Sequence, residues 1–168
     1  PGLVALSNCT ACDAGFACPE AATEPTECSP GMVQPSSGQG SCIECVAGKY
    51  QHGSSETACF DCTASNYCPS GASAELPCPS GRYSGAEGLW QDVQCTACPE
   101  GSFCSTGSLN HTLCSPGTVQ PAERQGTCAS CLEGSFMNES GKTACFECTP
   151  GSYCAEGASS APVSYTHL

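Results

Sequence analysis

Cysteine spacing limits what this chain can fold into more than any other feature. Nineteen of the 168 residues are cysteine, above the share of about 8–10 % that marks a disulfide scaffold in a short secreted chain. Leu, Ile, Val and Phe together supply only 20 residues, which is too few for an ordinary apolar core. Because folding must offset about 1–2 kcal/mol of chain entropy per residue, we expect covalent cross-links to supply the order that packing cannot.

The cysteines recur with a period of 86 residues. Each of the first nine, Cys9 to Cys68, has a counterpart 86 positions later, Cys95 to Cys154. This internal duplication defines a first copy over residues 1–86 and a second, truncated copy over residues 87–162. Cys78 predicts a cysteine at position 164, where Ser164 stands, so we interpret residues 163–168 as a non-native tail.

Two kinds of cysteine pattern alternate within the period. One reads C-x2-C-x5-C-x9-C, and the other reads C-x2-C-x13. The segments between them repeat a Gly-x-aromatic step, as in Gly48-Lys49-Tyr50 and Gly134-Ser135-Phe136. Glycine takes the positive-φ turn conformation that other residues avoid. We expect each aromatic ring to pack over a nearby disulfide as a minimal core.

The C-x2-C pairs leave three chemistries open: disulfides, zinc and thioredoxin-like redox chemistry. Cys42, Cys45, Cys59 and Cys62 have a fair zinc-ribbon spacing, but the C-x5-C and C-x9-C steps around them serve no zinc site. No βαβ pattern surrounds any C-x2-C, as redox chemistry would require. Three N-glycosylation sequons start at Asn8, Asn110 and Asn138, and they suit a secreted chain, so we favour structural disulfides.

Spacing leaves two pairing schemes. In the second, the first cysteine of each C-x2-C-x5-C-x9-C segment pairs with the third, and the second pairs with the fourth. This pairing forces tight Cys42–Cys45 and Cys128–Cys131 rings and leaves Cys148 without a partner. In the first, which we favour, every long loop closes on itself and Cys9 has no partner within this chain. Its nine bonds are Cys12–Cys18, Cys28–Cys42, Cys45–Cys59, Cys62–Cys68, Cys78–Cys95, Cys98–Cys104, Cys114–Cys128, Cys131–Cys145 and Cys148–Cys154.

These observations predict a small disulfide-rich fold. The long loops carry Pro and Gly near their starts and a second Gly near their ends, as in short irregular hairpins. No stretch shows a 3.6-residue period free of Gly and Pro, so we expect almost no helix. Because all the favoured bonds are local, each unit contacts only its neighbours. We therefore expect an elongated tandem array of short irregular β-hairpin modules.

A string of the form C-x2-C-P-x-G-x-[YF]-C runs from Cys95 to Cys104. It recurs from Cys145 to Cys154, where the proline stands one residue later. It resembles the ephrin-receptor-like cysteine-rich repeats, which are similar in style to tumour-necrosis-factor-receptor and EGF-like modules. The resemblance extends from Cys9 through Cys154. One copy departs, with Ser65 where Gly101 stands in the other, so we expect its turn to differ.

Several activities are disfavoured by composition. Four basic residues against sixteen acidic ones give a net charge of −12, which argues against nucleic acid and anionic membranes as partners. No segment has the ~20 apolar residues that span a bilayer. His52, His111 and His167 have no acidic partner at a recurring offset, and no phosphate loop or H-E-x-x-H motif is present. We expect no enzyme activity, no cofactor and no metal.

Long arrays of such repeats resemble those of surface-coat, adhesin and appendage proteins of single-celled eukaryotes, including flagellar hairs (mastigonemes). The resemblance implies a non-catalytic extracellular module of a filament, flagellar hair or cell-surface coat. Its expected partners are other subunits or copies, together with N-linked glycans. A ligand-binding receptor or adhesin ectodomain is the alternative, and metal storage is a third hypothesis. Trp90, the only tryptophan, is a candidate contact residue.

Overall fold

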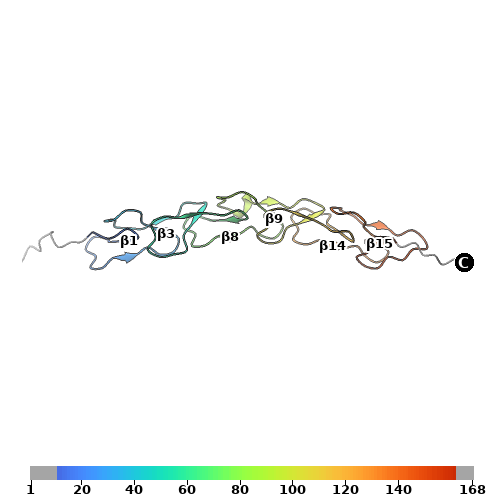
Figure 1. Cartoon of the computed structure of the whole chain (residues 1–168), viewed down its shortest axis with the longest axis horizontal. Helices are drawn as coiled ribbons and strands as arrows, with labels where there is room; N and C mark the ends of the chain where they lie inside the picture. Colours follow the sequence, from blue (N-terminus) through green and yellow to red (C-terminus); the bar gives the residue numbers. More distant parts are fainter. Residues whose placement is uncertain (1–10, 162–168) are drawn as a thin grey trace, which may run out of the picture. The chain divides into compact units, whose positions relative to one another are not determined.

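The computed structural model describes residues 11–161 (Figure 1). Over this range the chain forms eight two-stranded antiparallel hairpins and one short 3-10 helix, η2 (Asp92–Gln94). The predicted small disulfide-rich fold of tandem hairpins with almost no helix is confirmed. Cys9, Asn8, His167 and the tail at 163–168 lie outside the described residues.

Each hairpin joins two consecutive strands of two residues each. The pairs are β1 (Phe16–Ala17) with β2 (Thr26–Glu27), β3 (Met32–Val33) with β4 (Ile43–Glu44), β5 (Lys49–Tyr50) with β6 (Phe60–Asp61), β7 (Asn66–Tyr67) with β8 (Leu76–Pro77), β9 (Arg82–Tyr83) with β10 (Thr96–Ala97), β11 (Ser102–Phe103) with β12 (Thr112–Leu113), β13 (Thr118–Val119) with β14 (Ala129–Ser130), and β15 (Ser135–Phe136) with β16 (Phe146–Glu147).

A single sequence unit underlies all the hairpins. It starts with a cysteine, places Gly or Ser three residues later, and continues directly into the first strand of a hairpin. The second strand ends immediately before the next such cysteine. We call this unit a module and name it after its opening cysteine; the opening cysteines are Cys12, Cys28, Cys45, Cys62, Cys78, Cys98, Cys114, Cys131 and Cys148. Eight modules carry a hairpin, whereas the Cys148 module has the cysteine, Gly151 and a disulfide but no strand within the described residues. Five modules fill one 86-residue period, so the two cysteine patterns are two ways of closing one module.

Every module holds one disulfide, and the opening cysteine is one of its two members. In short-loop modules the bond spans a sequence separation of 6. In long-loop modules the separation is 14, or 17 in the Cys78 module. The nine bonds are those of the first pairing scheme, and the second scheme is wrong. Closing a loop of about 15 residues stabilises the fold by ~3 kcal/mol in the chain-entropy account.

Disulfide-bonded cysteines make up most of the buried apolar residues. Twelve of the sixteen buried apolar residues in the described range are cysteines, and the others are Ala17, Val33, Val119 and Met137. The aromatic rings do not form the core that their spacing predicts. Tyr50 and Phe136 are half-buried, and Tyr153 is 66 % exposed. The residue that follows each of these rings, Gln51, Met137 or Cys154, is buried instead.

The modules belong to two compact units, each described by itself. Within the described range the first contains residues 11–63, 67–76 and 87–91, and the second contains residues 64–66, 77–86 and 92–161. In the first unit, the N–H of each turn glycine donates to a carbonyl of the next module: Gly15 to Gln34, Gly31 to Gln51 and Gly48 to Cys68, at 2.7–2.8 Å. Successive modules are therefore joined in a fixed backbone register.

A second set of hydrogen bonds runs back along the first unit. It is made by residues with positive φ in the loops, whose N–H groups donate to the opening cysteines of earlier modules: Gly38 to Cys12, Ser55 to Cys28, Gly71 to Cys45 and Gly88 to Cys62. The second unit repeats both sets. There Gly101 donates to Gln120 and Gly117 to Met137, while Gly141 donates to Cys114 and Gly157 to Cys131.

The turn glycines also permit a close backbone approach. Gly48 has a φ of 86°, and a β-carbon added to it would lie 2.6 Å from the carbonyl oxygen of Gly88. Ser65 shows that the turn itself tolerates a side chain. It takes a φ of 67°, donates its N–H to Ser84 and accepts the N–H of Cys78, as the glycines do. The expectation of a different turn at Ser65 is therefore wrong.

Candidate functional site

The position directly after the first strand is the most constrained polar site of the long-loop modules. Gln51 is 1 % exposed. Its Nε2 donates to the Ala58 carbonyl at 2.6 Å, and its Oε1 accepts the Gly53 N–H at 3.0 Å. Gln34 and Gln120 make the same two bonds in their own loops. Each buried amide therefore connects the two sides of its long loop by hydrogen bonds.

Sequence reasoning missed this role, although a signal was present. Gln34 and Gln120 recur within the same Val-Gln-Pro string 86 residues apart. In the short-loop modules the same position holds the closing cysteine, for example Cys68. A module therefore either closes its disulfide at this position or buries another side chain there and closes the disulfide farther along.

The Cys131 module uses an apolar side chain at this position. Met137 is 1 % exposed and packs with Val119, Cys131 and Cys145. Met137 is the counterpart of Gln51 in the second copy of the 86-residue period.

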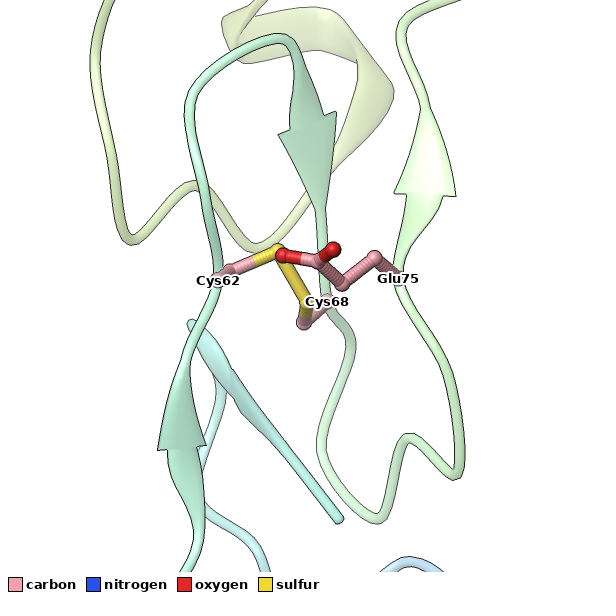
Figure 2. A group of neighbouring side chains, drawn as sticks. All are labelled: Cys62, Cys68 and Glu75. Atoms are coloured by element: carbon pink, nitrogen blue, oxygen red, sulfur yellow. A yellow bond between two sulfur atoms is a disulfide. The ribbon is translucent and has the colours of Figure 1, made fainter. Parts of the chain in front are cut away.

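Cys62, Cys68 and Glu75 form the one group within residues 11–161 whose ligand atoms gather as a metal site requires, all lying within 4.8 Å of one another. Figure 2 shows the two sulfurs joined to each other, with the Glu75 carboxylate beside them. The disulfide consumes both thiolates that a metal would need. Glu75 is further engaged, since its Oε1 accepts the Thr63 N–H at 2.5 Å. The cluster is a disulfide with an adjacent carboxylate.

The module pattern explains the position of Glu75. It lies three residues before the opening Cys78, where a long-loop module carries its closing cysteine. The four cysteines with zinc-ribbon spacing also do not form one site. Cys42 bonds Cys28, Cys45 bonds Cys59 and Cys62 bonds Cys68, so they belong to three disulfides.

Aromatic and imidazole rings gather on the Cys45 module. Tyr50 and Phe60 face each other across the hairpin of β5 and β6, with ring centroids 5.8 Å apart. The exposed His52 stacks on Phe60 at 5.6 Å with an interplanar angle of 16°. His111 lies edge-on to Tyr83 at 5.5 Å in the second unit. Both described histidines thus pack on aromatic rings.

The other predicted residues lie at the surface. Asn110 and Asn138 are exposed; the first precedes β12 and the second follows β15, in the loop that Cys131–Cys145 closes. Trp90 is 43 % exposed. Glycosylation of the asparagines and a contact at Trp90 stay predictions.

The chain matches no known protein-family model, and no curated protein is significantly similar to it. In the part of the chain that the structure describes, no helix has the length and apolar character needed to cross a membrane. The nine disulfides and repeated hairpins fit an extracellular module.

Proposed function

We propose that this chain is a non-catalytic segment of an extracellular filament, flagellar hair or cell-surface coat, built from ephrin-receptor-like cysteine-rich repeats. The observation that carries the proposal is the repeated backbone register within each unit. From Gly15 to Gly134 each turn glycine donates to the next module, and from Gly38 to Gly157 each positive-φ loop residue donates back to an opening cysteine. Such nearest-neighbour bonding is typical of repeat proteins that extend by adding identical units.

The chemistry of the side chains supports a structural role. In residues 11–161, the one group with clustered metal-ligating side chains is occupied by a disulfide. The buried glutamines bond to their own loops, and the described histidines pack on rings. These groups serve the fold, which leaves them unsuited to acid–base or nucleophilic catalysis.

Exposed apolar side chains favour the second candidate, a receptor or adhesin ectodomain. Trp90 is 43 % exposed, and Leu132 and Tyr153 are 75 % and 66 % exposed. Tryptophan and tyrosine are enriched at interface hot spots, so a ligand would bind at such side chains rather than along the repeated backbone.

Electron microscopy of the full-length protein, isolated from its source without reductant, tests the proposal. We expect ordered filaments or tubes with a regular axial repeat, which a thiol reductant disperses. Separate molecules that end in a globular head or a membrane anchor would contradict the structural role and favour the receptor or adhesin.

A further inference from the structure

We propose that Asn138 carries an N-linked glycan whose first sugar packs on the exposed ring of Phe146, in the place that His52 occupies over Phe60 in the counterpart module. The proposal assigns a partner to the aromatic pair of the Cys131 module. It requires passage through a secretory pathway, but it does not depend on the filament function.

The Cys45 module shows the geometry. Phe60 is 51 % exposed, and the His52 ring stacks on it with centroids 5.6 Å apart. Tyr50 completes the group at 5.8 Å from Phe60 and 6.2 Å from His52. A flat group at position 52 therefore stacks on the ring of Phe60 and lies beside that of Tyr50.

The Cys131 module has the same aromatic pair without the stacked imidazole. Phe136 and Phe146 are the counterparts of Tyr50 and Phe60, they face each other in the register of β15 and β16, and their centroids are 5.9 Å apart. The interplanar angles of the two pairs, 51° and 47°, are nearly equal. Phe146 is 52 % exposed. The residue in the position of His52 is Asn138, which starts the sequon Asn138-Glu139-Ser140.

The loop around Asn138 meets the requirements of an acceptor. Asn138, Glu139 and Ser140 are all exposed, and glycosylated asparagines lie on the surface. The loop is held in shape by the Cys131–Cys145 disulfide, by the Glu139–Lys142 ion pair at 2.8 Å and by the bond from the Gly141 N–H to Cys114. Positions 52 and 138 thus lie at the same point of two equally closed loops.

The modification forms one bond and breaks one. The side-chain amide nitrogen of Asn138 attacks C1 of an oligosaccharide carried on a lipid diphosphate, the C1–O bond to the diphosphate breaks, and the amide nitrogen loses one proton. A pyranose ring presents one face of C–H groups. Those groups carry partial positive charge and suit the electron-rich face of an aromatic ring. The first sugar then removes the exposed face of Phe146 from water.

The Asn110 sequon provides a control within the same chain. Asn138 stands two residues after Phe136, which pairs across the hairpin with Phe146. Asn110 stands two residues after Ser108, whose bridge partner Tyr83 already has the His111 ring edge-on at 5.5 Å. A glycan on Asn110 therefore has no facing pair of aromatic rings to pack on.

The experiment uses the full chain secreted from a eukaryotic host that makes high-mannose glycans. One variant keeps only the Asn138 sequon (Asn8→Gln with Asn110→Gln), and the control keeps only the Asn110 sequon (Asn8→Gln with Asn138→Gln). Each is compared after trimming to the first sugar and after complete removal of the glycan. We expect full occupancy at Asn138, with complete removal lowering Tm by about 2–4 °C and trimming leaving it unchanged. Removal at Asn110 leaves Tm unchanged.

Phe146→Leu keeps an apolar side chain but lacks the ring face. In this variant, we expect glycan removal at Asn138 to leave Tm unchanged. NMR gives a readout that does not depend on stability: protons of the first sugar shift upfield with Phe146 and return to normal with leucine. An unmodified Asn138, or equal Tm loss and unshifted sugar protons in both backgrounds, would overturn the proposal.

The counterpart module allows the site to be transplanted. His52→Asn completes an Asn-Gly-Ser sequon at positions 52–54, over Phe60. We expect the new glycan to raise Tm relative to the same variant with Ser54→Ala, which cannot be glycosylated, and Phe60→Leu to abolish the gain. A glycosylated variant without that gain would count against the geometry.

Discussion

The Cys45 and Cys131 modules stand 86 residues apart and close the same loop with the same disulfide, yet they bury opposite chemistry beneath it. The Gln51 side-chain amide makes two hydrogen bonds within its loop, whereas Met137 packs against Val119 and two half-cystines. Both side chains are 1 % exposed. The disulfide and the backbone register fix the loop in both cases, so the buried residue needs only to fill its place and leave no polar group unpaired.

The two modules also differ on their hairpins. Lys49 forms an ion pair with Asp61 at 2.5 Å, but its counterpart Ser135 faces Glu147. This difference and the exchange of the buried side chain give matched substitutions that separate the module's own stability from its contacts.

Removing the disulfide has the largest expected effect. Cys45→Ala with Cys59→Ala, and Cys131→Ala with Cys145→Ala, each destabilise the chain by ~3 kcal/mol. The second pair costs more, because it also removes atoms that pack on Met137, while Gln51 keeps its loop bonds after the first. Urea unfolding measures both losses. A larger loss at Cys45–Cys59 would show that the buried glutamine does not hold its loop.

Substituting glycines of positive φ separates backbone strain from close approach. Gly48→Ala and Gly107→Ala both place a side chain at positive φ, which destabilises by about 1–2 kcal/mol. Gly48→Ala has a further penalty of about 1–3 kcal/mol, because its β-carbon collides with the Gly88 carbonyl, whereas a β-carbon on Gly107 makes an ordinary contact with Cβ of Pro77 at 3.5 Å. Thermal unfolding of the two variants gives the difference. Equal losses would mean that the Gly88 segment moves away freely.

Exchanging the buried side chains tests the comparison directly. Gln51→Met leaves the Gly53 N–H and the Ala58 carbonyl without their partner, a loss of about 1–3 kcal/mol. Met137→Gln loses less, since the same loop geometry offers the new amide equivalent bonds. Hydrogen exchange at the Gly53 amide should speed up in the first variant. Gln39→Met, at an exposed glutamine, is the control; a comparable loss there would remove the distinction.

The ion pair has the smallest effect. Lys49→Ser reproduces the second copy, and because both partners are well exposed it destabilises by ~0.2–1 kcal/mol. Ser135→Lys should gain a similar amount by facing Glu147. Both changes are measured by denaturant unfolding and should disappear near 1 M salt, where screening acts within about 3 Å. An effect that persists at high salt would point to packing of the lysine stem.

The fold was largely predictable because the cysteines determine it. Local loops such as Cys45–Cys59 follow from spacing, and Pro and Gly punctuate the hairpins, so pairing and fold class were both accessible. The single repeating module could not be predicted from cysteine spacing, because its closing cysteine has two alternative positions and the spacing therefore shows two patterns. The common module becomes visible when the opening cysteines are aligned by the turn glycine three residues later, as in Cys45 with Gly48.

The buried residues were harder to predict for a physical reason. A glutamine usually lies at the surface, and only the three-dimensional loop shows that Gln51 finds both a donor and an acceptor. The aromatic rings were placed in the core because large rings bury the most area. In a two-residue strand each ring packs on a single cross-strand partner, and His52 stacks on Phe60 without enclosing it, so Phe60 and Phe146 stay half exposed.

The short reach of each disulfide bears on how the chain is made. No bond joins cysteines more than 17 positions apart in the described range, so a nascent chain can close each one soon after its module enters an oxidising compartment. The glycine hydrogen bonds then form as the following module arrives. Oxidative folding therefore proceeds in the order of synthesis. Since each thiol finds its partner nearby before distant ones appear, adding modules lengthens the product without multiplying wrong pairings.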